Sequence, residues 1–339
     1  MPHTETPARA AVDCVPTVGV VIPVYRCADY VRGCLESVLA QTHPVSEIVL
    51  VDDRGGDDSV PVAQQVLAAH GRPYTLVTQP ENGGLGRARN AGLAALGTDL
   101  VWFLDSDDQA EPRFVERLLA ALTHGGADFA VCRTARVDEA GRVLQIDEAP
   151  APSSLVPGRV YARELLCGRA KAYACTKLYR RAVLGDRPWA EDQAYEDLLP
   201  SLTMALDADR VALIDQPLYR YLYREGSLST ALSEQTFDLF VVARQVRELL
   251  AGTDPGWQRD YLAFWYRQVL TSVAHVAMRV HHAQGRKPAL YDRALREVRA
   301  GISLRDVPTL LAGRRFREAI FAVLVKLNPG LYSAVLRWR

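Results

Sequence analysis

The chain has 339 residues, of which 49% are hydrophobic and 24% are charged. This composition is typical of a folded globular protein and excludes an intrinsically disordered chain. Forty basic residues balance forty acidic residues, so the overall charge gives no reason to expect a nucleic-acid partner. The six cysteines lack CxxC spacing, which argues against a zinc site or a dense disulfide framework and fits a reducing cytoplasm.

The two ends of the chain carry the signals that bear on location. The first residues lack the apolar core of a signal peptide, and no segment reaches the roughly 18 apolar residues of a membrane-spanning helix. Residues 285–339 contain twelve basic and four acidic residues. This segment either meets an anionic membrane surface or an acidic partner, or it presents solvated helix faces. We expect a cytoplasmic protein that is soluble, or peripheral at the inner face of the membrane.

The first third of the chain alternates strand-like and helix-like segments. Apolar, strand-like runs occupy 17–25, 47–53, 74–80 and 99–108, and segments with helical periodicity separate them. Strands that are apolar on both faces and are separated by single helices predict a parallel sheet with helices on both sides. Ligands of such sheets bind beyond the carboxyl ends of the strands.

The rest of the chain divides at about residue 235. Residues 111–235 mix helix and strand signals, whereas the pattern from 236 onward is helical. We therefore expect three parts, which are an N-terminal extension (1–16), an α/β domain (17–235) and a helical region (236–339).

Three of the predicted strands end in groups that can bind a ligand. These groups are Pro23-Val24-Tyr25, Asp52-Asp53 and Asp105-Ser106-Asp107-Asp108. Neighbouring carboxylates repel one another unless a cation or solvent is present, and hard oxygen ligands suit Mg²⁺ or Mn²⁺. The alternative is that Asp107 or Asp108 caps the following helix, and that the earlier pair belongs to the turn that contains Gly55 and Gly56.

Two further polar segments are candidates for the same site. Glu196-Asp197 stands at the start of a predicted helix, where capping is the alternative to a functional role, and Asp192 is a nearby rival for that role. The glycine-rich segment 82–90 has neither Walker nor GxGxxG spacing, which argues against a P-loop nucleotidase and a dinucleotide dehydrogenase. Its Arg87 and Arg89 either face a diphosphate at a helix N-terminus or lie on the surface of a tight turn.

Six segments follow one another along the chain: VGVVIPVYRCADYVRGCLESVLAQT, EIVLVDD, ENGGLGRARNAGLAALGTDLVWFLDSDD, TKLYRR, EDLLPSL and PLYRYLYREGSLS. Together, and in this order, they resemble family 2 glycosyltransferases of bacterial type. The resemblance covers roughly residues 17–230. It implies a GT-A (Rossmann-like) α/β fold with a mostly parallel central sheet flanked by helices, followed by a C-terminal helical region.

The resemblance also implies roles for particular residues. Pro23, Val24 and Tyr25 would line the nucleoside pocket, and Asp52 would contact the base. Further substrate-binding candidates are Asp53, Arg89, Asp105, Ser106, Lys177, Glu196 and Arg224. Of these, Lys177 and Arg224 either approach the diphosphate or acceptor or have structural roles in turns.

The acidic motifs receive separate tasks in this family. Asp105 and Asp107 match the DxD motif that holds a divalent cation (Mg²⁺ or Mn²⁺), with Asp107 as the direct ligand. Asp197 matches the general base of inverting members. One departure is Arg54-Gly55-Gly56, which stands where the family usually has a glycine followed by small hydroxyl residues.

The expected function is therefore inverting transfer of a sugar from a nucleotide-diphosphate sugar, with a UDP-sugar favoured, to an acceptor hydroxyl in polysaccharide, glycolipid or secondary-metabolite synthesis. The alternatives are a catalytically silent scaffold that binds nucleotide-sugar and, ranked below it, a sugar-nucleotidyltransferase. The basic, amphipathic segment 317–339 predicts either a peripheral membrane contact, packing against the catalytic domain, or a homo-oligomer formed through the C-terminal helices.

Overall fold

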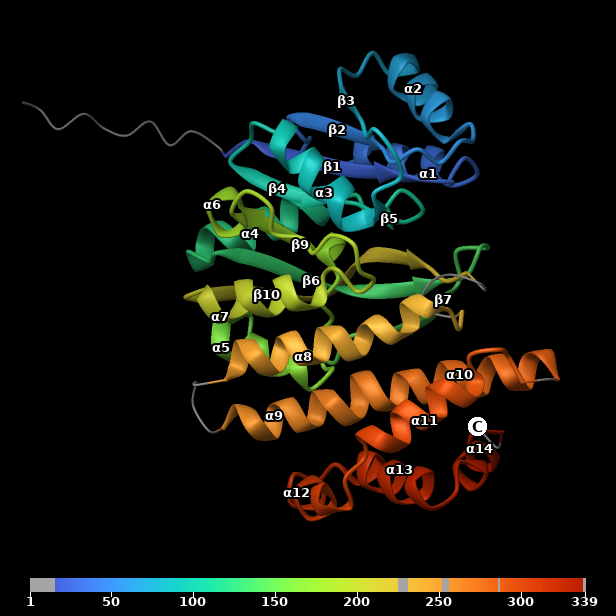
Figure 1. Cartoon of the computed structure of the whole chain (residues 1–339). Coiled ribbons are helices and arrows are strands. Elements are labelled where there is room, and N and C mark those ends of the chain that lie inside the picture. Colours follow the sequence, from blue (N-terminus) through green and yellow to red (C-terminus); the bar gives the residue numbers. More distant parts are fainter. Residues whose placement is uncertain (1–15, 225–230, 252–255, 286, 338–339) are drawn as a thin grey trace, which may run out of the picture.

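The computed structural model describes residues 16–224, 231–251, 256–285 and 287–337. All but the last residue of the expected N-terminal extension, and the EGSLS part of the last motif, lie outside the described residues. Within them the chain forms one mixed sheet covered by helices on both faces, followed by a layered group of helices (Figure 1).

The sheet has the strand order β3-β2-β1-β4-β9-β6-β10-β5, with β7 beside β6 and β8 beside β10. The strands are β1 (Val18–Val24), β2 (Glu47–Asp52), β3 (Thr75–Thr78), β4 (Leu100–Phe103), β5 (Gln109–Ala110), β6 (Phe129–Val137), β7 (Val143–Ile146), β8 (Leu155–Pro157), β9 (Lys177–Arg180) and β10 (Arg210–Leu222). Every residue of β1 is buried, which agrees with its apolar character on both faces and its central position.

The predicted parallel arrangement is confirmed for β3, β2, β1 and β4. The second half of the sheet is mixed, because β9 runs antiparallel to both β4 and β6, and β5, β7 and β8 also pair antiparallel. Strand–helix alternation, the signal of parallel pairing, is confined to the first third of the chain. The strands that follow can therefore enter the sheet in either direction.

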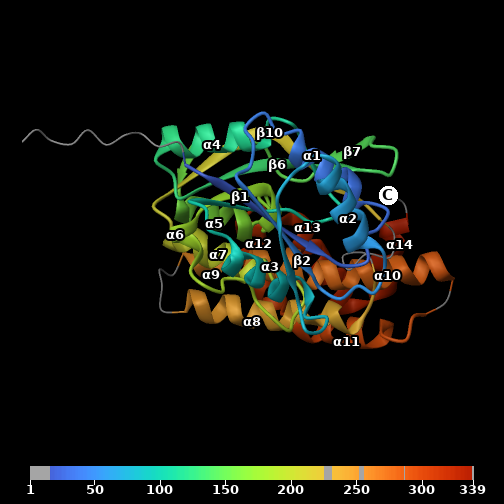
Figure 2. The same cartoon turned by 90° about the horizontal axis from the view of Figure 1, so that it is seen from above.

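Two sets of helices cover the sheet. One hydrophobic core joins the sheet to α1 (Val31–Leu39), α2 (Ser59–Ala69) and α4 (Phe114–Gly125). The other joins the opposite face to α3 (Gly84–Ala95), α5 (Gly158–Leu166), α6 (Arg181–Leu184) and α7 (Leu198–Asp207). Figure 2 shows the helices on both sides of the strands.

The C-terminal region is helical, as expected. After a 3-10 turn at Glu234–Phe237 it comprises α8 (Asp238–Leu250), α9 (Trp257–Phe264), a π-helical turn (Trp265–Leu270), α10 (Thr271–Gln284), α11 (Tyr291–Gly301), α12 (Val307–Ala312), α13 (Phe316–Leu327) and α14 (Pro329–Arg337). Its buried side chains belong to the same core as α3, α5 and α7. The helices are therefore anchored on the sheet by apolar burial, and the boundary near residue 235 is a change of secondary structure rather than a break in the core.

Candidate active site

The strand register brings the predicted site residues to one edge of the sheet. Asp52 lies opposite Val24 of β1, and β4 ends at Phe103, opposite Val21. Because β9 is antiparallel to β4, its first residue, Lys177, lies at the edge where β4 ends. β6 and β10 run in the same direction as β4, so Arg224, just after β10, belongs to that edge as well.

The adjacent residues Asp52 and Asp53 have different surroundings. The Asp53 carboxylate is buried and accepts hydrogen bonds from the Asn82 side chain and the amides of Gly83 and Gly84, at 2.9, 2.8 and 3.0 Å. Burial is the main cause that raises the pKa of Asp53. The more open Asp52 accepts a 2.9 Å hydrogen bond from the amide of Arg54. Neither aspartate caps α2, since its N-cap residue is Asp58. Asp53 thus anchors the glycine-rich turn, whereas the Asp52 side chain, 18% exposed, contacts Arg54 in the turn that leads to Gly55 and Gly56.

Gly86 in the glycine-rich helix α3 allows a close approach of the loop that precedes Glu196. A Cβ atom placed on Gly86 would lie 1.9 Å from the carbonyl oxygen of Ala190. The absence of a side chain therefore allows this loop to lie directly on α3. The same helix carries Arg89 one turn further on, so this contact brings Arg89 and Glu196 together.

The structure separates the two arginines of α3. Arg87 is partly exposed and pairs with Asp192, with 2.9 Å between Nη2 and Oδ1. Arg89 is only 2% exposed; its Nη2 donates to Asp105 Oδ1 at 2.7 Å and its Nη1 to Glu196 Oε1 at 2.6 Å. Burial acts to lower the pKa of Arg89, but the two carboxylates outweigh it and the net shift is upward. Arg89 is thus a buried bridge between the two acidic motifs.

The aspartates after β4 divide into one buried carboxylate and two accessible ones. Asp108 is 2% exposed and accepts hydrogen bonds from the Tyr219 hydroxyl at 2.7 Å and the Leu222 amide at 2.8 Å. The side chains of Asp105 and Asp107 are 23% and 27% exposed. The N-cap residue of α4 is Arg113, so neither Asp107 nor Asp108 caps that helix.

Asp107 forms an ion pair with Arg224. Burial, followed by the negative charge of Asp105, raises the pKa of Asp107, while Arg224 opposes this effect. Two carboxylates this close at a partly open edge are stabilised by positive charge. Arg224 supplies one such charge, and it approaches from the end of β10.

The acidic cluster after β4 contains candidate ligands for a hard divalent cation. Among the described residues, ligand atoms of Asp105, Asp108 and Cys175 lie within 4.8 Å of one another. Burial, however, raises the pKa of the Cys175 thiol well above its usual range, and sulfur is a soft ligand. Asp108 already accepts two hydrogen bonds from the protein. Asp105 and Asp107 each pair with an arginine as well, but their side chains are partly exposed and offer oxygen atoms, the ligand type that Mg²⁺ and Mn²⁺ prefer.

Asp197 directly precedes α7, and its side chain makes no capping hydrogen bond to this helix in the described part of the chain. Burial, and next the charge of Glu196, raise the pKa of Asp197. The ammonium of Lys177 is 1% exposed and donates to the carbonyl oxygens of Lys171 and Tyr173. Burial lowers the pKa of Lys177, and the charge of Asp197 opposes that shift. Lys177 is therefore a buried cation that acts on Asp197 through its field.

Residues 19–187 match the family model described as glycosyl transferase family 2. The chain belongs to this family. It is 29% identical to EpsH of Bacillus subtilis (strain 168) over 66% of this chain and 65% of EpsH. It is 24% identical to the uncharacterized glycosyltransferase YibD of Escherichia coli (strain K12) over 81% of both chains. It is also 29% identical to the succinoglycan biosynthesis protein ExoO of Rhizobium meliloti (strain 1021), over 69% of this chain and 68% of ExoO. The aligned part thus spans slightly less than two thirds of EpsH.

Solved structures show the same fold. TarS 1–349 from S. aureus, crystallised in complex with UDP-GlcNAc, has a TM-score of 0.68 at 20% identity, and the match covers 91% of this chain and 90% of that one. The mannosyltransferase PcManGT from Pyrobaculum calidifontis, in complex with GDP-Man and Mn²⁺, has a TM-score of 0.52 at 16% identity and covers 93% and 88%. The family 2 glycosyltransferase described here therefore has the expected GT-A fold.

The remaining predicted residues lie at the ends of β1 and β4. Pro23 and Val24 are buried at the end of β1, and Tyr25 is 42% exposed beside them. Ser106 is 7% exposed, between the two accessible aspartates. The sequence therefore identified the groups at this edge, and the structure brings them together.

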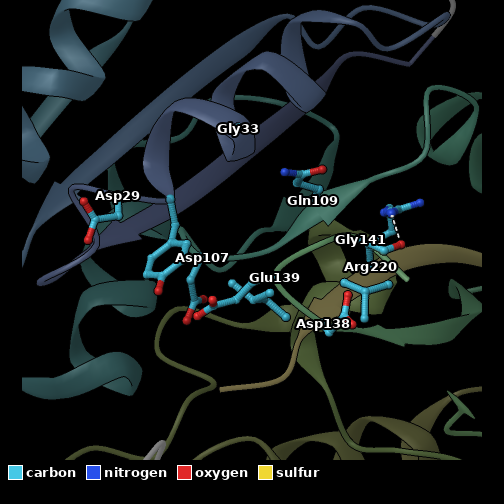
Figure 3. A pocket seen from close by; sticks show the side chains of 11 residues that line it. Asp29, Gly33, Asp107, Gln109, Asp138, Glu139, Gly141 and Arg220 are labelled. Carbon is cyan, nitrogen blue, oxygen red and sulfur yellow. Dashed lines mark hydrogen bonds between the residues drawn. The ribbon is translucent and has the colours of Figure 1, made fainter. Parts of the chain in front are cut away.

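A cavity of about 390 Å³ opens beside Asp107 in this glycosyltransferase. Figure 3 shows Asp107 between Asp29, next to α1, and Arg220 of β10. Glu139, from the turn between β6 and β7, lines the same cavity. Neither Glu139 nor Arg220 was among the predicted site residues. Arg220 lies within the segment PLYRYLYREGSLS, which was a signal for it, whereas none of the quoted motifs contains Glu139.

Proposed function

We propose that this family 2 glycosyltransferase transfers a sugar from a nucleotide-diphosphate sugar to an acceptor hydroxyl with inversion at the anomeric carbon. The main observation that supports this proposal is the buried bridge formed by Arg89. It joins Asp105, at the diphosphate side, to Glu196, whose neighbour Asp197 is the proposed base. A fixed distance between the leaving-group side and the base is what a single displacement requires.

The proposed donor is a UDP-sugar. The TarS structure in complex with UDP-GlcNAc supports this choice because it is a fold neighbour that covers nearly the whole chain. PcManGT, with GDP-Man, has lower similarity. In our proposal Pro23, Val24 and Tyr25 line the nucleoside pocket and Asp52 binds the base, since its carboxylate is the open member of its pair.

Asp105 and Asp107 are proposed to hold Mg²⁺ or Mn²⁺, which when bound would neutralise the charge that grows on the diphosphate leaving group. Arg89 positions Asp105, and Arg224 faces Asp107. In our proposal Arg224 also approaches the diphosphate, supported by its pair with Asp107.

Asp197 is proposed to accept the proton of the acceptor hydroxyl. The acceptor oxygen forms its bond to the anomeric carbon while the bond from that carbon to the diphosphate oxygen breaks. A base works best when its pKa lies near the working pH, and burial raises the pKa of Asp197 in that direction. Its carboxylate is available because it is not used to cap α7 in the described chain.

The proposed acceptor is a saccharide hydroxyl. Support comes from the name of ExoO, which belongs to succinoglycan biosynthesis. We also propose a reducing, cytoplasmic location, supported by five buried cysteines with free thiols among the described residues.

The deciding experiment measures donor binding and donor turnover separately. Thermal unfolding is followed with UDP, GDP or ADP, each with and without Mn²⁺, and release of UDP from UDP-sugars is followed with and without saccharide acceptors. We expect a Mn²⁺-dependent stabilisation by UDP and slow UDP release even without acceptor. Stabilisation without any UDP release would instead identify a silent binder. Absence of stabilisation by every nucleotide would exclude the proposed donor class.

A further inference from the structure

Helix α13 is apolar on two opposite sides. Ala319, Phe321, Ala322 and Val325 are at most 2% exposed and pack into the core. Phe316, Ile320 and Leu327 are 57%, 56% and 68% exposed. At 3.6 residues per turn these three project within roughly 40° of one another. One side of α13 therefore holds the helix in place, and the other is a continuous apolar stripe at the surface.

Three further exposed leucines lie on helical turns that pack against α13. Leu304, Leu311 and Leu331 are 47%, 45% and 54% exposed. Six of the twelve large hydrophobic residues that are exposed in the described chain thus lie between residues 304 and 331. We call Leu304, Leu311, Phe316, Ile320, Leu327 and Leu331 the C-terminal apolar face. Such a concentration marks an interaction surface, whereas isolated exposed hydrophobic residues do not.

Basic and acidic side chains near the C-terminal apolar face differ in exposure. Arg305, Arg314 and Arg317 are exposed. The acidic side chains of the same segment are turned inward. Asp306 accepts a 2.9 Å hydrogen bond from the Tyr266 hydroxyl, and Glu318 is 8% exposed. The face that solvent sees is therefore apolar and basic.

We propose that the C-terminal apolar face docks on the surface of a bilayer that contains anionic phospholipids. Apolar side chains enter the boundary between headgroups and acyl chains, while neighbouring arginines attract the negative headgroups. A second copy of the chain fits less well, because two such faces in contact would bring arginines together without an exposed acid between residues 304 and 331 to pair with them. No helix in the described residues has the length and apolarity needed to cross a membrane.

The position of this surface is compatible with simultaneous catalysis. Helices α12 and α13 lie at the end of the molecule opposite β2 and β3 (Figure 1). None of the residues placed in the active site above belongs to the C-terminal apolar face. The proposal therefore does not depend on the proposed sugar transfer, and each can fail alone.

Flotation of the full chain with lipid vesicles tests the proposal. We expect the chain to float with vesicles of phosphatidylcholine mixed with phosphatidylglycerol, and to stay at the bottom with phosphatidylcholine alone. The combined variant Phe316→Ser/Ile320→Ser/Leu327→Ser should lower the partition coefficient at least roughly tenfold. The matched control is Val143→Ser/Leu144→Ser on β7, whose side chains are 56% and 53% exposed but lie outside this face; it should bind vesicles like the unchanged protein.

A charge variant keeps the test decisive if the serine variant misfolds. Arg314→Glu/Arg317→Glu changes exposed side chains only and should lower vesicle binding by at least roughly tenfold, since each basic residue near an anionic surface contributes a factor of roughly five. Raised salt should have a similar effect. Equal flotation of all these variants would overturn the proposal. The proposal would also fail if analytical ultracentrifugation showed a dimer that the serine substitutions dissociate, while neither the unchanged protein nor the serine variant bound vesicles.

Discussion

Arg89 Nη2 lies 2.7 Å from Asp105 Oδ1 although the arginine side chain comes from α3 and is almost fully buried. Its other terminal nitrogen is 2.6 Å from Glu196. Sixteen residues of sequence separate Arg89 from Asp105, and 107 separate it from Glu196. The two acidic motifs therefore share one cation, and their geometry depends on it.

Loss of this bridge should damage both stability and activity. Arg89→Met leaves the carboxylates of Asp105 and Glu196 without their buried partner, which should cost about 3–5 kcal/mol in the free energy of unfolding. Chemical denaturation measures this change. The control Arg87→Met removes a partly exposed partner of Asp192 and should cost about 1 kcal/mol or less. Equal losses for the two variants would contradict the bridging role.

Asp197→Asn should lower kcat by at least roughly 100-fold, because the amide cannot accept the proton of the acceptor. Donor binding should persist, since the proposed donor contacts are made by other residues. Isothermal titration with UDP and Mn²⁺ checks binding, and steady-state transfer checks kcat. The control is Asp192→Asn, an exposed aspartate five residues earlier in the same loop, which should transfer normally. Near-normal turnover by Asp197→Asn would remove this residue from the base role.

The pH dependence of kcat should report the environment of Asp197. The carboxylate is the active form of a base, and burial raises its pKa above the usual value of about 3.9. Activity should therefore be full at high pH and fall as pH decreases through the raised pKa, earlier than an ordinary aspartate would allow. A profile of kcat against pH measures the midpoint. If the residual activity of Asp197→Asn keeps the same acidic limb, another group causes it.

Removal of the Asp107 carboxylate should make the binding of UDP independent of the divalent cation. Asp107→Ala should weaken binding of UDP when Mn²⁺ or Mg²⁺ is present and have little effect in chelator. Thermal shift with the four combinations of UDP and Mn²⁺ provides the measurement. Glu116→Ala, an exposed carboxylate on α4, serves as the control. Unchanged activity of the unmodified enzyme in excess chelator would exclude the metal assignment.

The neighbouring residues Asp52 and Asp53 should separate into a binding role and a structural role. Asp53→Ala removes the acceptor of three hydrogen bonds from residues 82–84 and should cost about 1.5–3 kcal/mol of stability. Asp52→Asn should change stability by no more than about 0.5 kcal/mol but weaken UDP binding. Thermal denaturation and UDP titration of both variants distinguish the roles. A loss of stability in Asp52→Asn together with a loss of UDP binding in Asp53→Ala would give the structural role to Asp52 and the binding role to Asp53.

Prediction from the sequence succeeded where the signal is local. Apolar runs ending in Asp52, Asp105 and Asp107 predict parallel strands whose carboxyl ends meet at one edge, and the structure has this arrangement. The antiparallel direction of β9 could not be predicted, because the residue pattern of Lys177–Arg180 is equally suited to a parallel or an antiparallel strand. That direction decides that Lys177 lies beside the end of β4.

The sequence by itself determined the α/β class, the edge of the sheet that holds the candidate site and the residue types gathered there, because periodicity and strand-end composition are properties of consecutive residues. Only the tertiary structure decided that Arg89 is buried between Asp105 and Glu196, and that Asp53 rather than Asp52 holds the glycine-rich turn. Neighbouring side chains of the same type differ in burial and partners according to which distant segments pack against them. Those partners lie from 16 to 107 residues away along the chain, beyond the reach of any local pattern.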